Sequence, residues 1–148
     1  MIRIPKDFKE FLQLLNENDV PYLLVGGYAV GIYGYPRATG DMDIWIAIDP
    51  ESSEKIVTVL QSFGFDTPEI EPELFQQPDK IIRMGHPPMR IEVHTSITGV
   101  NFERAYSNRE IQEIDGIPIK VIGLEDLKNN KKATGRFKDL DDLENLTN

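Results

Sequence analysis

Two aspartates one position apart are the residues of this sequence best suited to chemistry. Asp41 and Asp43 open the run 41–48, in which apolar side chains alternate with other types, as in a β-strand with one face in the core. Residues i and i+2 of a strand lie on the same face, so both carboxylates can bind one hard cation or a pair of cations. The pattern therefore predicts a metal site on this strand.

A third carboxylate is expected because two metal ions about 3.5–4 Å apart need shared ligands to align an attacking oxygen with its leaving group. Glu92 is the candidate, since it shares a polar strand face with Arg90 and His94. The alternative is that Glu92 is an ordinary solvated residue paired with Arg90 or Lys80. His94 is then either a partner of Glu92 or, as is more common for a lone histidine, a structural residue.

The glycine pair Gly26-Gly27 ends an apolar run, 22–25, that predicts a buried strand, and it precedes a short helix expected at 28–33. Glycines let the backbone approach a ligand closely, and a helix N-terminus offers unpaired amides and a positive dipole end. The pair therefore predicts a turn that holds phosphate groups ahead of the two aspartates.

Composition narrows the choice of metal and partner. The 148 residues include no cysteine and two histidines, which excludes thiolate ligands and favours Mg²⁺ or Mn²⁺ over zinc. A net charge of −9 argues against extensive binding of duplex DNA, although a local basic patch could hold one nucleotide or an RNA end. No apolar run is long enough to span a bilayer and the N-terminus lacks a signal peptide's apolar core, so we expect a cytoplasmic protein.

The remaining patterns predict the elements that position these groups. Helices are predicted at 5–16, 28–33, 50–63 and, with a break near Gly135, from 124 to the end. Strands are predicted at 22–25, 41–48, 80–84, 89–95, 110–114 and 117–122, and residues 66–78 are predicted to be an exposed loop. The length fits one domain over residues 1–148, of the α/β class, with a mixed central sheet flanked by helices.

Taken together, these features resemble the DNA polymerase β-like nucleotidyltransferase superfamily, and within it the small bacterial branch of abortive-infection toxin-type enzymes. The resemblance rests on the segments 24–30, 37–43, 90–93 and 127–143. It implies a palm-type fold and the metal-assisted transfer of a nucleoside monophosphate from an NTP to an acceptor hydroxyl, with release of pyrophosphate.

The resemblance also assigns residues to the site. Asp41 and Asp43 match the paired metal-binding aspartates, and Glu92 would complete the metal site or act as a base towards the acceptor hydroxyl. Gly26 and Gly27 match the turn that holds the β- and γ-phosphates. The superfamily more often has Gly-Ser at this turn and a third aspartate in place of Glu92, so the glutamate needs a strand slightly farther from the metal.

Further nucleotide-binding positions follow from the same resemblance. Arg37 and Thr39 match positions that lead into the aspartate pair, and Lys131 and Lys138 match basic positions of the C-terminal helices. Either one or two of the cations in 128–138 reach the site, or the run is a solvated face. The apolar residues of the last helix are expected to form a buried stripe that folds it over the sheet: Phe137, Leu140 and Leu143.

The acceptor remains open between a tRNA end, a protein hydroxyl and a small molecule such as an antibiotic. Because the chain is short for such an enzyme, a protein partner could complete the cleft. The rival interpretation is a non-catalytic nucleotide-binding or toxin–antitoxin partner module on the same fold.

Overall fold

A six-stranded mixed sheet forms the centre of the fold. The computed structural model describes residues 4–35, 40–86 and 90–146. The strand order is β3-β4-β2-β1-β6-β5, in which β2 is parallel to β4, β1 is parallel to β6, and the other pairs are antiparallel. The strands are β1 (Tyr22–Val25), β2 (Asp41–Ile46), β3 (Ile81–Met84), β4 (Arg90–His94), β5 (Glu110–Ile114) and β6 (Ile117–Val121). This arrangement confirms the predicted class and the predicted mixed sheet.

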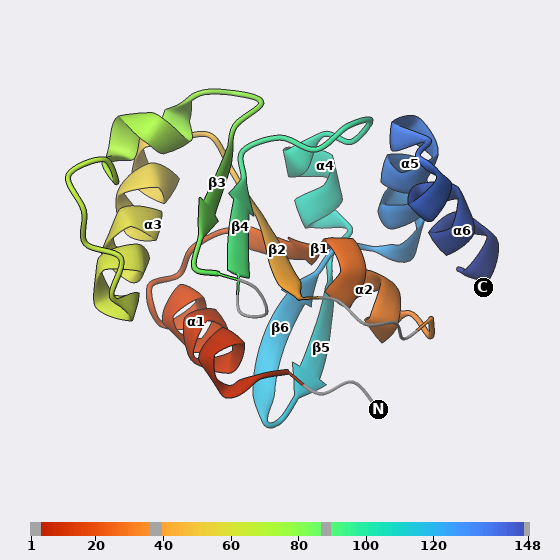
Figure 1. Ribbon diagram of the computed structural model, residues 1–148, viewed down its shortest axis with the longest axis horizontal. Coiled ribbons are helices and arrows are strands. Elements are labelled where there is room, and N and C mark those ends of the chain that lie inside the picture. Colours follow the sequence, from red (N-terminus) through yellow and green to blue (C-terminus); the bar gives the residue numbers. More distant parts are fainter. Residues whose placement is uncertain (1–3, 36–39, 87–89, 147–148) are drawn as a thin grey trace.

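Helices lie on both sides of the sheet in the view of Figure 1. They are α1 (Lys6–Glu17), α2 (Gly26–Ile32), α3 (Pro50–Phe63), α4 (Phe102–Ser107), α5 (Leu124–Thr134) and α6 (Phe137–Asn145), with a short 3-10 helix η1 (Pro72–Gln76). Helices α1 and α3 pack on each other at one end of the molecule, and α5 and α6 pack on each other at the opposite end. None of the helices in the described part of the chain is long and apolar enough to cross a membrane.

The two longest helices form for the reasons that the sequence suggests. Helix α1 buries one apolar stripe at the predicted spacing, made of Phe8, Phe11, Leu12 and Leu15. In α3 the Asp49 side chain accepts a hydrogen bond from the backbone N–H of Ser52 at 2.8 Å, and Pro50 occupies the first turn. Gly64 ends the helix with a φ of 109°, a conformation that favours glycine.

Three elements differ from the predictions. Helix α2 begins at Gly26, so both glycines belong to the helix and do not precede it. The predicted loop 66–78 contains η1, which buries Phe75 completely and contacts α3. Helix α4 was not predicted; it is capped by the side chain of Asn101, and its Phe102 packs edge-on against buried Trp45 at 5.0 Å between ring centroids.

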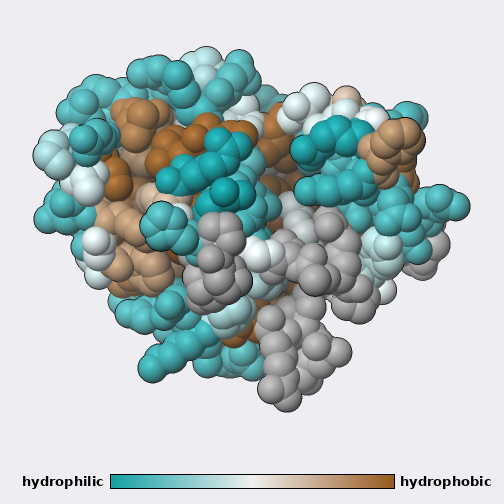
Figure 2. Space-filling view, in the orientation of Figure 1, coloured by the Kyte–Doolittle hydropathy of each residue, from teal (hydrophilic) through white to brown (hydrophobic). Residues whose placement is uncertain are grey.

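The predicted apolar stripe of α6 is wrong. Phe137 is 94% exposed and Leu140 is 47% exposed, whereas Asp139 and Asp142 are buried together with Leu146. Figure 2 shows apolar atoms on the surface over the region of α5 and α6, among hydrophilic neighbours. The buried face follows the spacing i, i+3, i+7 but carries two acids, because a buried lysine of α5 pairs with them. The ion pairs with Lys131, the buried Leu146 and a hydrogen bond from Tyr35 to Asp141 attach α6 to the rest of the protein.

Candidate active site

The register of two parallel strands brings the predicted carboxylates together. In the pairing of β2 with β4, Asp43 lies opposite Glu92 and Asp41 lies opposite Arg90. His94 follows two positions after Glu92, so it shares the polar face of the strand. One sheet face therefore carries all three predicted metal ligands.

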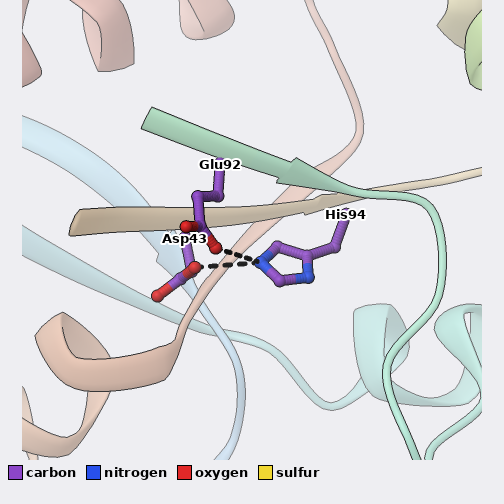
Figure 3. A group of neighbouring side chains, drawn as sticks. All are labelled: Asp43, Glu92 and His94. Atoms are coloured by element: carbon purple, nitrogen blue, oxygen red, sulfur yellow. Dashed lines mark hydrogen bonds and ion pairs between the residues drawn. The ribbon is translucent and has the colours of Figure 1, made fainter. Parts of the chain in front are cut away.

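Asp43, Glu92 and His94 form the tightest part of this cluster. Each offers one ligand atom, and these atoms lie within 4.8 Å of one another (Figure 3). His94 Nε2 lies 2.9 Å from Asp43 Oδ1 and 3.8 Å from Glu92 Oε1. The two carboxylates offer oxygen ligands that suit Mn²⁺ or Mg²⁺, whereas the imidazole nitrogen suits a transition metal and not Mg²⁺. The histidine is thus a direct partner of Asp43, and the alternation 90, 92, 94 is the signal that places it there.

Two arginines form ion pairs with carboxylates of the site. Arg90 Nη2 donates to Asp41 Oδ2 at 2.8 Å and lies 3.2 Å from Glu92 Oε2. From the edge strand β3, Arg83 Nε donates to the same Glu92 oxygen at 3.3 Å. The alternative pairing of Glu92 with Arg90 is therefore present, yet it engages Oε2 and leaves Oε1 directed at His94. Arg83 was not assigned from the sequence, because its contact depends on the pairing of β3 with β4.

Burial and neighbouring charges shift the pKa values of Glu92 and Arg90. Glu92 is 8% exposed, and burial raises its pKa above the ordinary value; the negative charge of Asp43 raises it further. The hydrogen bond to Asp41 raises the pKa of Arg90, so this guanidinium stays charged. Crowding of the carboxylates thus disfavours the ionised glutamate, and a cation bound between them would remove that cost.

Gly26 has a steric role that the sequence did not reveal. Its φ is +69°, and a Cβ at this position would lie 2.9 Å from Asp43 Cγ and collide with the carboxylate. The glycine therefore makes room for Asp43 at the start of α2. Gly27 is the next residue of the helix and is buried. Both glycines line the cavity described below, as a phosphate-binding role requires.

A cavity of about 360 Å³ lies above the carboxylates and has a size typical of small-ligand sites. One wall is formed by the sheet residues Asp41, Asp43, Glu92 and His94 with the two glycines. Another wall comes from the junction of α5 and α6, through Thr134, Arg136, Lys138 and Asp139. Acidic and basic surfaces thus share one cavity, which is what a metal-bound phosphate chain requires.

The predicted nucleotide-binding residues differ in their placement. Lys138 is exposed and lines the cavity. Lys131 also borders the cavity but is 4% exposed, and its Nζ lies 3.0 Å from Asp142 and 3.3 Å from Asp139. Arg37 and Thr39 lie outside the described residues. A nucleotide role for Lys131 stays a prediction, and its observed contacts are internal.

Comparisons with solved structures support the same fold. A protein of Thermotoga maritima described as a candidate nucleotidyltransferase matches with 16% identity over 94% of this chain and 87% of its own, at a TM-score of 0.60. A lincosamide antibiotic adenylyltransferase with bound lincomycin matches with 18% identity over 97% and 96%, at a TM-score of 0.58. An antigenic nucleotidyltransferase-like protein from Paracoccidioides brasiliensis matches with 19% identity over 95% and 72%, at a TM-score of 0.56. A search of curated proteins finds no match.

The sequence pattern of a known family supplies the stronger evidence. The pattern of the family described as aminoglycoside-2''-adenylyltransferase matches residues 7–146. The predicted resemblance to nucleotidyltransferases is thereby confirmed, while membership of the toxin-type branch stays a prediction. Because the match spans nearly the whole chain, the protein belongs to the aminoglycoside-2''-adenylyltransferase family and is a nucleotidyltransferase.

Proposed function

We propose that this nucleotidyltransferase uses Mg²⁺ or Mn²⁺ to transfer a nucleoside monophosphate from an NTP to a hydroxyl group of a small molecule. The observation that carries the proposal is the shared cavity, with converging carboxylates on the sheet wall and cationic side chains on the α5–α6 wall. The family name and the lincomycin-bound neighbour favour a small-molecule acceptor over an RNA end or a protein hydroxyl.

Asp41, Asp43 and Glu92 would hold the cation. Asp43 Oδ1 and Glu92 Oε1 lie 2.9 Å and 3.8 Å from His94 Nε2, and Asp41 lies on the same strand face as Asp43. A bound divalent cation would polarise the phosphoryl oxygens and offset their negative charge. The arginines keep the carboxylates in place, since Arg90 bridges Asp41 and Glu92 across the two strands.

The transfer itself is an in-line displacement. The acceptor oxygen forms a bond to the α-phosphorus, the bond from that phosphorus to the bridging oxygen breaks, and pyrophosphate leaves. Glu92 is also the proposed acceptor of the hydroxyl proton, because its carboxylate lines the cavity beside the proposed cation site. Gly26 and Gly27 would approach the β- and γ-phosphates from the start of α2.

Labelled transfer tests this proposal directly. The protein is incubated with each NTP labelled at the α-phosphate, with Mg²⁺ or Mn²⁺, and with separate pools of aminoglycosides, lincosamides, total RNA and cell lysate. We expect a labelled small molecule with the wild type and none with Asp43→Asn. Labelled RNA or protein alone would show that the acceptor class is wrong. NTP binding without product in any pool would overturn catalysis and favour the nucleotide-binding module.

A further inference from the structure

We infer that Arg136 binds the phosphate chain of the nucleotide and that buried Asp139 is the positioning residue that holds its guanidinium at the cavity wall. The inference rests on the proposed function, because it names a further residue of the same site. Arg136 was visible in the sequence only as one of several cations near the C-terminus.

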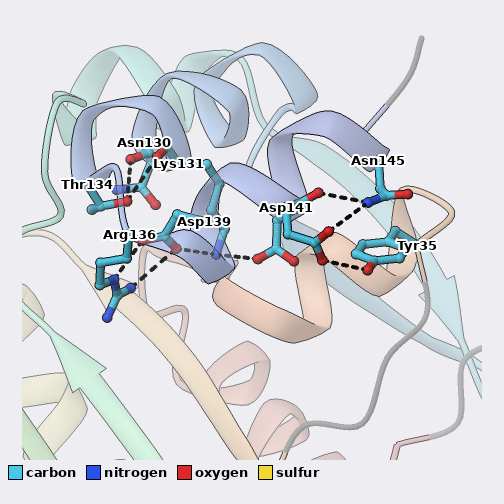
Figure 4. A network of polar contacts seen from close by, with 9 residues as sticks. Tyr35, Asn130, Lys131, Thr134, Arg136, Asp139, Asp141 and Asn145 are labelled. Carbon is cyan, nitrogen blue, oxygen red and sulfur yellow. Dashed lines mark hydrogen bonds and ion pairs between the residues drawn. The ribbon is translucent and has the colours of Figure 1, made fainter.

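Arg136 lies where the chain turns from α5 into α6. Gly135 ends α5 with a φ of 65°, and Arg136 occupies the N-cap position of α6 without a capping hydrogen bond from its side chain. The side chain of Arg136 is 67% exposed and lines the cavity. It is nevertheless held in one direction, because Nε and Nη2 donate to Asp139 Oδ2 at 2.6 Å and to Oδ1 at 3.3 Å (Figure 4). An exposed arginine fixed at two nitrogens is prepared to bind a ligand at little further entropic cost.

Asp139 is a rigid anchor for this arginine. Its side chain is 0% exposed, and it also accepts a hydrogen bond from Lys131 Nζ at 3.3 Å. Burial alone would raise the pKa of Asp139, but hydrogen bonds from Arg136 and Thr134 and the charge of Lys131 bring it well below its ordinary value. The carboxylate is therefore ionised at neutral pH and fixed among its donors.

The charges on the two walls of the cavity are complementary in the way a nucleotide requires. The metal ligands occupy the sheet wall, so the phosphate chain needs cations on the wall facing them. Arg83 is engaged with Glu92, Lys131 is engaged with two buried aspartates, and exposed Lys138 is a second cation on the same wall as Arg136. Arg136 keeps further N–H donors beyond the two nitrogens bound to Asp139, and a planar guanidinium suits phosphate oxygens.

Binding of Mg²⁺-tripolyphosphate and Mg²⁺-ATP by titration calorimetry tests the role of Arg136, since tripolyphosphate probes the phosphate contacts without a base. Arg136→Ala should lower the binding affinity for both ligands by about tenfold or more, given the strength of charged hydrogen bonds. Arg136→Lys should recover part of the loss, because it restores the charge without the fork. The matched control is Lys132→Ala, which removes an exposed charge from the same segment and should change neither affinity.

A second comparison isolates the positioning role of Asp139. Asp139→Asn and Asp142→Asn each remove a buried acidic partner of the same lysine, but the hydrogen bonds of Arg136 go to Asp139. Asp139→Asn should therefore lower the affinity for tripolyphosphate more than Asp142→Asn does, even where the two variants have the same melting temperature. In the double variant Arg136→Ala/Asp139→Asn, affinity should equal that of Arg136→Ala alone.

The outcomes separate this inference from the proposed function. If the wild type binds neither ligand, both are overturned. If the wild type binds and Arg136→Ala binds within twofold of it, the role of Arg136 is overturned while the proposed function stands. Equal losses in Asp139→Asn and Asp142→Asn, or additive losses in the double variant, would show that Asp139 only supports the fold.

Discussion

Lys131 is expected to be the most sensitive charged residue of the fold. Lys131→Met keeps most of the aliphatic volume but leaves Asp139 and Asp142 buried without their shared cation. Removing one partner of a buried ion pair costs about 3–5 kcal/mol, and the low end applies here because Arg136 still binds Asp139. For a domain of this size about 3 kcal/mol corresponds to a fall in melting temperature of roughly 6–12 °C.

The single tryptophan provides the assay. Trp45 is 1% exposed and packs on Phe102, so its emission should shift to the red when the domain unfolds. Lys132→Met on the exposed side of α5 is the control and should change stability by no more than about 0.5 kcal/mol. A variant at Lys131 as stable as the control would refute the ion network as the link between α5 and α6.

The pH dependence gives a second, independent test of the same reasoning. In the wild type the lowered pKa of Asp139 contributes stability that is complete above its ordinary pKa and is lost as the pH falls through the lower folded value. In Lys131→Met the two carboxylates lack their shared cation, so they are more costly when ionised, and protonation relieves that cost. The difference between variant and wild type should therefore be largest at neutral pH and shrink towards about pH 4. A difference that stays constant over this range would contradict the electrostatic explanation.

Three further predictions concern the sheet wall of the site. Gly26→Ala should reduce nucleotidyl transfer about a hundredfold, because its Cβ would displace the Asp43 carboxylate, whereas Gly116→Ala, at a φ of +79° in open space, should cost stability alone. Mn²⁺ or Mg²⁺ should raise the melting temperature of the wild type but not of Asp43→Asn, and equal shifts in both would contradict the metal site. Glu92→Gln should stabilise the metal-free protein above about pH 4.5 and have no effect below it, because the raised pKa of Glu92 disfavours the ionised form in the fold; denaturant titrations at both pH values would show this.

The elements with strong periodicity were predictable from the sequence, and so was the shared sheet face of Asp41, Asp43 and Glu92. The alternation around Asp43 and Glu92 determines which face each side chain occupies, so their convergence needed only the pairing of the two strands. Helix α4 was missed because six residues are too few for an apolar stripe to be visible. The prediction of the buried face of α6 was wrong because it counted only apolar residues. Asp139 and Asp142 are buried because they pair with a lysine on another helix, which such a count cannot detect. Such pairings depend on tertiary geometry that local patterns do not contain.

The in-register pairing of β2 with β4 also limits how this protein can evolve. Deleting one residue within Arg90–His94 would move the residues on one side of the deletion to the opposite face, so that apolar side chains would point towards the cavity and charged ones into the core. Substitutions in this strand change one contact at a time, whereas insertions and deletions exchange its two faces at once. The turn at Asp115-Gly116 carries no such constraint, because it is an exposed hairpin connection at the far edge of the sheet. Length variation among functional variants should therefore concentrate in such turns and be absent from the strands that hold the carboxylates.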